Sequence, residues 1–133
     1  MRLEIPLRIQ SVANLREHWA AKARRVSLER AAVALVMRTT AETWEWRDLM
    51  AAEVGGHSVV TLTRIAPRAL DDDNLRSALK SVRDEVADQL GLPNDRDHRV
   101  RWEYGQERGK PKQYAVRVEI RAAELAPREE APK

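Results

Sequence analysis

Acidic side chains gather at one point of the chain, in the segment Leu70-Asp71-Asp72-Asp73-Asn74-Leu75. Three adjacent carboxylates repel one another, so their clustering requires compensation. A helix N-terminus supplies part of it through its free N–H groups and its partial positive charge. A divalent cation would supply the rest, and oxygen ligands without His or Cys favour the hard ions Mg²⁺ and Mn²⁺. The segment therefore predicts either a heavily capped helix start or part of a metal site.

A second pair of aspartates, Asp95 and Asp97, repeats the alternate spacing of Asp71 and Asp73. Side chains two residues apart point to the same side of an extended segment. The first pair follows a strand-like segment and the second pair precedes another, so we expect the intervening helix to carry the chain back and the four carboxylates to converge. Such a site acts on phosphates, because a bound metal neutralises phosphodiester charge and activates a water molecule. A calcium-binding EF-hand is excluded, since Arg76 and Val82 stand where that loop requires Gly and Glu.

Basic residues are concentrated in the first forty positions, which hold eight Lys or Arg and three Glu. Arginine predominates there, and its planar guanidinium binds phosphate through two parallel hydrogen bonds. A polyanionic partner such as a nucleic acid is one interpretation. A solvated helix face is the other.

The composition excludes several classes of protein. The 133 residues suit one domain, and the absence of cysteine excludes disulfides and thiolate metal sites. No apolar run approaches the ~20 residues that span a bilayer, and the N-terminal segment lacks the apolar core of a signal peptide. The five glycines are dispersed, so no phosphate-binding glycine loop is present, and His18, His57 and His98 show no paired-ligand spacing. We expect a soluble cytoplasmic protein that does not contact the membrane.

Apolar periodicity predicts four strands and two helices. The strands are expected at about 2–9, 57–65, 100–104 and 114–121, with Pro6 marking the first as an edge strand and the last two forming an antiparallel hairpin. The first helix covers about 15–38, either as one long helix or as a basic arm followed by a helix capped at Ser27. The second covers about 73–90 and ends at Gly91.

The order β-α-β-α-β-β predicts an α/β (α+β) fold, a two-layer sandwich with a short mixed sheet and two main helices on one face. We expect one domain over residues 1–121 and a mobile tail over residues 122–133, which is rich in Pro, Glu and Lys.

The motif Asp71-x-Asp73-Asn74-Leu75 opening a helix, with a second Asp-containing loop after it, resembles the RusA-like Holliday-junction resolvases. The resemblance extends over about residues 3–121 and includes Asn14, the basic segment and Val26-Ser27-Leu28-Glu29. It implies a homodimeric, Mg²⁺-dependent endodeoxyribonuclease that nicks two strands of a four-way DNA junction symmetrically. A two-fold dimer matches the symmetry of such a junction.

The resemblance also implies roles for individual residues. Asp71 and Asp73 match two catalytic, metal-binding aspartates. The third falls on Asp95, which we prefer, or on Asp97, which otherwise supports the site. The family often has a lysine three residues after the motif asparagine, where this chain has Ser77.

Two nearby cations, Lys80 and Arg76, are therefore the candidates to stabilise the developing charge in place of that lysine. The residues expected to hold the DNA backbone are Arg16, Lys22, Arg24, Arg25, Arg68 and Arg76.

Two other functions fit the same residues. One is a non-catalytic DNA-binding or regulatory protein on the same fold, in which Ser77 marks the loss of the chemistry. The other is a small Mg²⁺-dependent phosphohydrolase acting on nucleotides, against which the missing phosphate loop counts.

Overall fold

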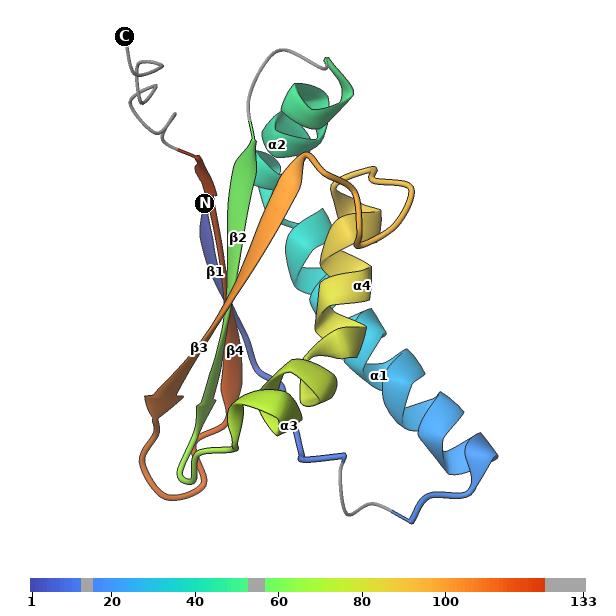
Figure 1. Cartoon of the computed structure of the whole chain (residues 1–133), viewed down its shortest axis with the longest axis vertical. Coiled ribbons are helices and arrows are strands. Elements are labelled where there is room, and N and C mark those ends of the chain that lie inside the picture. Colours follow the sequence, from blue (N-terminus) through green and yellow to red (C-terminus); the bar gives the residue numbers. More distant parts are fainter. Residues whose placement is uncertain (13–15, 53–56, 124–133) are drawn as a thin grey trace, which may run out of the picture.

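The protein is described by a computed structural model over residues 1–12, 16–52 and 57–123. Within these ranges, four helices lie on one face of a four-stranded mixed sheet (Figure 1). This arrangement confirms the predicted two-layer α+β fold. In chain order the elements are β1 (Arg2–Ile5), α1 (Trp19–Arg38), α2 (Ala41–Ala51), β2 (Ser58–Ala66), α3 (Asp72–Ala78), α4 (Lys80–Gln89), β3 (Val100–Arg108) and β4 (Ala115–Ala122).

The strands lie in the order β1-β4-β2-β3. Strand β4 is antiparallel to both β1 and β2, whereas β2 and β3 are parallel, from Ser58 opposite Val100 to Ala66 opposite Arg108. The predicted β3–β4 hairpin is therefore wrong, because β2 lies between these two strands. Strand β2 is buried at almost every position, as a central strand with a partner on each side should be.

Strand β1 ends at Ile5, earlier than predicted, and Pro6 follows at once. Proline has no N–H for the ladder, so the strand stops there. The predicted edge position of β1 is confirmed. At the other end of the chain β4 includes Ala122, one residue beyond the predicted domain limit. The remaining tail prediction, for residues 124–133, and the resemblance at Asn14 lie outside the described residues.

Helix α1 is continuous from Trp19 to Arg38, which settles the choice between a long helix and a basic arm in favour of the helix. The side chain of His18 caps its start, because Nδ1 accepts a hydrogen bond from the N–H of Ala20 at 3.2 Å. Ser27, the alternative cap, lies inside the helix. Lys22, Arg24 and Arg25 are therefore held on a helix.

The second predicted helix is divided at Leu79 into α3 and α4. The break lets two short apolar faces reach the core at different angles, Leu75 and Ala78 on α3 and Val82 and Val86 on α4. The predicted end at Gly91 is confirmed. Its φ of +74° is the left-handed conformation that glycine adopts without strain.

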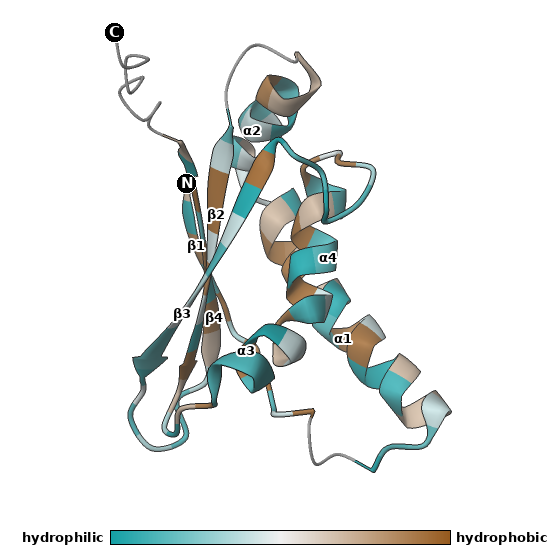
Figure 2. Cartoon of the chain, viewed as in Figure 1, coloured by the Kyte–Doolittle hydropathy of each residue, from teal (hydrophilic) through white to brown (hydrophobic). Residues whose placement is uncertain are grey.

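The core lies between the helices and the covered face of the sheet, where brown residues of the strands face brown residues of α1 and α4 (Figure 2). Val60 and Leu62 of β2 contribute from the sheet, Val33 from α1 and Val86 from α4. All four side chains are fully buried. No helix in the described ranges has both the length and the apolar character needed to cross a membrane.

Within the described ranges no helix covers the opposite face of the sheet, which carries long charged side chains. Arg117 of β4 reaches Glu4 of β1 at 3.0 Å and Glu107 of β3 at 2.7 Å, so its guanidinium extends across β2. Beneath this layer Val59 and Ile65 of β2 are buried. Charged side chains whose aliphatic stems cover apolar surface explain how this face stays in water.

Candidate functional site

The acidic segment lies where β2 leads into α3. Asp71 precedes the helix with an extended backbone, and Asp72 and Asp73 occupy its first turn. All three side chains are exposed. Gln106 of β3 holds the segment in place, because its side-chain amide accepts from the N–H of Leu70 at 2.8 Å and donates to the carbonyl of Leu70 at 2.7 Å.

The carboxylates of this segment lack compensation from nearby cations. In the described part of the chain, no ion pair joins Asp71 or Asp73 to a basic side chain, and the Asp71 side chain makes no capping hydrogen bond. The interpretation of the segment as an over-built cap is thus weakened at Asp71. The positive end of the short helix is the compensation that the fold itself provides.

Asp71 and Asp73 follow the end of β2, and Asp95 precedes the start of β3, but these two strand ends are not neighbours in the sheet. Because β2 and β3 are parallel and in register, the start of β3 lies beside the start of β2. The end of β2 lies about 26 Å away, at about 3.3 Å for each residue of the strand. The loop at 93–99 instead folds back along α4, and this brings Asp95 to the N-terminal turn of that helix.

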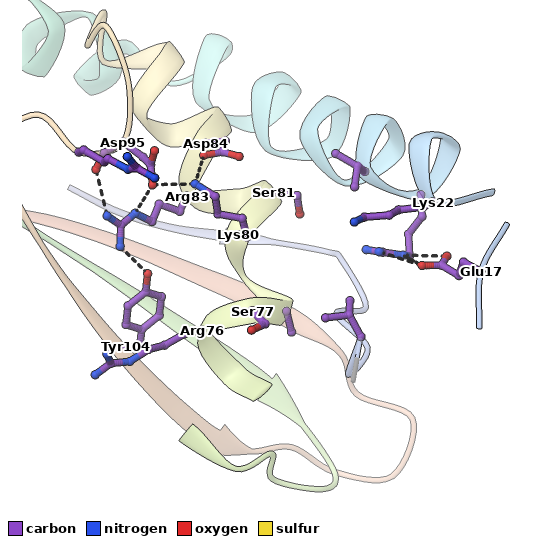
Figure 3. Close-up of a pocket in the computed structure, with 15 residues that line it drawn as sticks. Glu17, Lys22, Arg76, Ser77, Lys80, Ser81, Arg83, Asp84, Asp95 and Tyr104 are labelled. Atoms are coloured by element: carbon purple, nitrogen blue, oxygen red, sulfur yellow. Dashed lines mark hydrogen bonds and ion pairs between the residues drawn. The ribbon is translucent and has the colours of Figure 1, made fainter. Parts of the chain in front are cut away.

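Asp95 is enclosed by donors from α4 and β3 (Figure 3). Its Oδ2 accepts a hydrogen bond from Lys80 Nζ at 2.8 Å and lies 2.8 Å from Arg83 Nε, whose N–H is not directed at that oxygen. Its backbone carbonyl accepts from Trp102 Nε1 at 2.8 Å and from an Arg83 Nη at 3.1 Å. The hydrogen bond from Lys80 lowers the pKa of Asp95, and that bond, with a second one to Asp84, raises the pKa of Lys80.

Asp97 is engaged by its neighbour Arg99. The guanidinium donates to both carboxylate oxygens, at 2.8 Å and 3.0 Å, and the Arg99 N–H adds a third hydrogen bond at 3.0 Å. These bonds lower the pKa of Asp97 to about 2. Arg99 also donates to the carbonyl of Met50 at 2.8 Å, so Asp97 helps to fasten the loop before β3 to the end of α2.

The predicted convergence of four carboxylates is therefore absent from this structure. Over residues 1–12, 16–52 and 57–123, no group of three or more His, Cys, Asp or Glu side chains is placed to hold a metal ion. The reason is tertiary: basic side chains of α4 and of the loop bind Asp95 and Asp97, while Asp71 and Asp73 stay exposed at α3.

A cleft of about 880 Å³ lies between α1, α3, α4 and the 93–99 loop (Figure 3). We call it the basic cleft. Its lining has six basic and three acidic side chains. It brings together five residues that the sequence analysis selected, namely Lys22, Arg25, Arg76, Lys80 and Asp95.

Half of the cations in the basic cleft are already paired. The Arg25 guanidinium donates at least two hydrogen bonds to the Glu17 carboxylate, with an ion-pair distance of 3.0 Å, and contacts Glu29 at 3.2 Å. Lys80 and Arg83 hold Asp95, as described above.

The other three cations, Lys22, Arg76 and Arg96, form no ion pair within the described residues. They come from α1, α3 and the loop, so they approach the cleft from three sides. Such an arrangement is suited to a ligand with several negative charges.

One aromatic side chain, Tyr104 of β3, also lines the basic cleft. The Arg76 guanidinium lies over the Tyr104 ring, 5.6 Å from the ring centroid. The Tyr104 hydroxyl accepts a hydrogen bond from Arg83 at 2.8 Å. The sequence analysis missed Tyr104, Arg83 and Arg96. The sequence feature that could have identified Arg83 is its position three residues after Lys80, on the same face of α4.

Three predicted DNA-binding residues lie outside the basic cleft. Arg16 is exposed ahead of α1. Arg24 lines a smaller hollow beside Arg8 and Leu28. Arg68 lines another hollow at the end of β2. In the comparisons with known proteins, no family model, no curated protein and no solved structure matches the chain.

Proposed function

We propose that the protein is a Mg²⁺-dependent endodeoxyribonuclease for four-way DNA junctions, and that the basic cleft holds the DNA backbone. One observation carries the proposal: five residues selected for DNA binding or catalysis from distant parts of the sequence line the same cleft. The excess of basic side chains in that cleft suits phosphates. Its three cations without an ion pair among the described residues suit successive phosphates of a strand.

The positions of the aspartates favour a metal site with two carboxylate ligands rather than the predicted three or four, because Asp95 and Asp97 are already bound by basic side chains. Mg²⁺ is commonly held by one or two carboxylates together with water and the phosphates of its substrate. Asp71 and Asp73 are the residues that would hold it, because they are exposed and without ion pairs in the described part of the chain. A bound Mg²⁺ would supply an activated water and offset the phosphate charge.

The remaining polar residues then have distinct tasks. Arg76 is the cation best placed to meet a phosphate, because it follows the acidic segment on α3 and forms no ion pair among the described residues. Lys80 is held between Asp84 and Asp95 at 2.9 Å and 2.8 Å, so its charge is largely offset. We assign Lys80 and Asp95 to holding the loop and the cleft wall together.

A second candidate is a DNA-binding protein that does not cleave. It is favoured by the contacts of Asp95, which bind the expected third catalytic carboxylate to Lys80 and Arg83. It predicts junction binding that weakens with salt, indifference to Mg²⁺ and no effect of removing a carboxylate from the acidic segment.

The decisive experiment is cleavage of a synthetic four-way junction with Mg²⁺ or Mn²⁺. We expect the wild-type protein to nick it, and Asp71→Asn and Asp73→Asn to slow cleavage at least about 100-fold while leaving binding intact. Asp72→Asn is the matched control, an exposed carboxylate in the same turn. It should cleave at close to the wild-type rate.

The outcomes separate the candidates. Binding without nicking by the wild-type protein, in the presence of either ion, would establish the non-catalytic candidate. Equal loss in all three variants would show that net charge matters rather than two particular ligands.

A homodimer and a cytoplasmic location, both expected from the sequence, belong to the same proposal. Solution mass from light scattering tests the dimer, which the symmetric nicking of a junction requires. A protein that is monomeric in solution and on the junction would not nick both strands in a concerted way.

A further inference from the structure

Among the residues that the structure describes, one arginine is buried without an acidic partner. Arg64, near the end of β2, is 7% exposed and lies on the covered face of the sheet with Val60 and Leu62. Its Nε donates to the carbonyl of Ile9 at 2.9 Å and one Nη donates to the carbonyl of Arg68 at 2.7 Å. Within the described residues no carboxylate forms an ion pair with it.

This arrangement is costly for the cation. Removing a guanidinium from water is unfavourable, and two neutral carbonyls satisfy its hydrogen bonds without compensating its charge. Burial lowers the pKa of Arg64, and the neighbouring Arg8 acts in the same direction. A neutral donor such as a glutamine amide can also donate to carbonyls, so the two carbonyls alone do not require a full positive charge at this position.

Arg64 lines a hollow of about 480 Å³ at the end of β2 and β3, together with Arg68 and Arg108. We call it the Arg64 pocket. Among its described lining residues one is acidic, Glu107, and Arg117 holds it at 2.7 Å. The pocket therefore presents three arginines and one carboxylate whose charge is already compensated.

We propose that the Arg64 pocket binds a phosphate group of a nucleic-acid strand. Guanidinium groups match the geometry of phosphate oxygens, and an anion there would compensate the buried charge. Ala69 lines the pocket and Asp71 follows two residues later, so the bound phosphate would lie beside the acidic segment. The inference rests on the proposed function only for the source of the phosphate.

The first test is calorimetric titration with inorganic phosphate, at constant ionic strength with chloride as the reference ion. Arg108→Gln is the principal variant, because Arg108 is exposed and its replacement leaves the core intact. We expect it to weaken phosphate binding about 10-fold, the effect of losing one charge-assisted hydrogen bond. Arg64→Gln should weaken binding at least as much.

Arg101→Gln is the matched control. It removes an exposed arginine from the same strand, β3. Arg101 does not line the pocket, and it forms an ion pair with Glu103 at a distance of 3.1 Å. Phosphate affinity should be unchanged. Equal affinity in Arg108→Gln, Arg101→Gln and the wild-type protein would overturn the site.

The second test measures junction binding against salt concentration. Arg108→Gln should reduce the slope of log K against log salt by about one, and Arg101→Gln should leave it unchanged. Loss of phosphate binding with an unchanged slope would overturn the nucleic-acid source and leave a site for a free anion. Neither measurement depends on cleavage, so both tests give a result even if the protein has no nuclease activity.

Discussion

At the scale of single residues, two aspartates of one loop are held in different ways. Asp95 accepts a hydrogen bond from Lys80 of α4, whereas Asp97 accepts from Arg99, which also donates to the carbonyl of Met50 in α2. Both carboxylates have a lowered pKa because a cation donates to each of them. Each is therefore ionised through the neutral range, and each fixes one end of the loop.

The Asp97 contacts predict a pH-dependent contribution to stability. Its folded pKa of about 2 lies below the ordinary 3.8. The contribution is therefore complete above about pH 5 and is lost progressively as the pH falls through 3.8 towards 2. Asp97→Asn should lower the free energy of unfolding by about 1–2 kcal/mol at pH 7. Urea unfolding at pH 7, 4 and 3 measures it, and the difference from wild type should shrink at each step.

Glu45→Gln supplies the comparison for that experiment. Glu45 lies exposed on α2 with no ion pair in the described part of the chain, so its replacement should change stability by less than about 0.5 kcal/mol at every pH. An Asp97→Asn difference that stays constant from pH 7 to pH 3 would show that the ion pair does not stabilise the fold.

The sequence carried part of this information at the residue scale. The positions of Asp71, Asp73 and Asp95 were recognisable because clustered charge is visible in a linear sequence. The partners were not, since Lys80 and Arg83 meet Asp95 only when the loop folds back along α4. Arg64 did carry a local signal, because alternation places it on the same face as Val60 and Leu62.

At the scale of elements, α1 and α4 both line the basic cleft, and buried polar contacts join the two helices. Ser81 Oγ donates to Glu29 at 2.6 Å, and Arg30 contacts Glu85 at 2.9 Å. Glu29, Ser81 and Glu85 are all buried. Glu29 also binds Arg25, so this contact extends to a cation that lines the cleft.

The hydrogen bond between Ser81 and Glu29 should stabilise the pairing of these helices. Ser81→Ala leaves a buried carboxylate short of a donor, and we expect it to lower the free energy of unfolding by about 1–3 kcal/mol. Ser27→Ala is the same substitution at an exposed position of α1, and its effect should stay within about 0.5 kcal/mol. Chemical denaturation measures both, and equal stability of the two variants would contradict the role of the bond.

Periodicity located most elements within a few residues. The strands β2, β3 and β4 and the C-terminal end of α4 follow local patterns, and Gly91 marks that end by its backbone freedom. The break at Leu79 was not predictable, because the apolar spacing from Leu75 to Val86 continues through it. Leu75 and Ala78 of α3 and Val82 and Val86 of α4 all enter the core, so the break is compatible with burial on both sides of it.

At the scale of the whole molecule, charge is distributed unequally. On the open face of the sheet, Arg101, Arg117 and Arg121 form ion pairs with glutamates, as Arg117 does with Glu4 and Glu107. The basic cleft and the Arg64 pocket keep an excess of positive charge. This distribution supports the proposal that a polyanion binds on the side of the molecule that carries these two hollows.

The order of the strands in the sheet was not predictable from local sequence patterns. The alternation of Val100, Trp102 and Tyr104 fixes which side chains face the core, but it is the same whether β3 pairs with β4 or with β2. The choice depends on contacts between residues far apart in the chain. The expected meeting of Asp71 and Asp95 depended on where β3 begins, and the parallel register of β2 and β3 places that start at the end of β2 far from Asp71.

The central place of β4 predicts opposite effects of two truncations. A chain that stops at residue 114 lacks the strand that joins β1 to β2, and we expect it to have no cooperative thermal unfolding. A chain that begins at residue 6 loses only the four-residue edge strand β1 and should keep a cooperative transition at a lower Tm. Circular dichroism during heating tests both, and cooperative unfolding of the first chain would refute the central role of β4.

The position of β4 also has a consequence for the order of events during synthesis. The strand that fills the middle of the sheet is made after the other three, so β1 and the inner edge of β2 have unpaired backbone groups until residues 115–122 have left the ribosome. Unpaired edges of this kind favour association with other chains. For a nascent copy of this protein, the interval before β4 arrives is thus the period in which chaperone protection matters most.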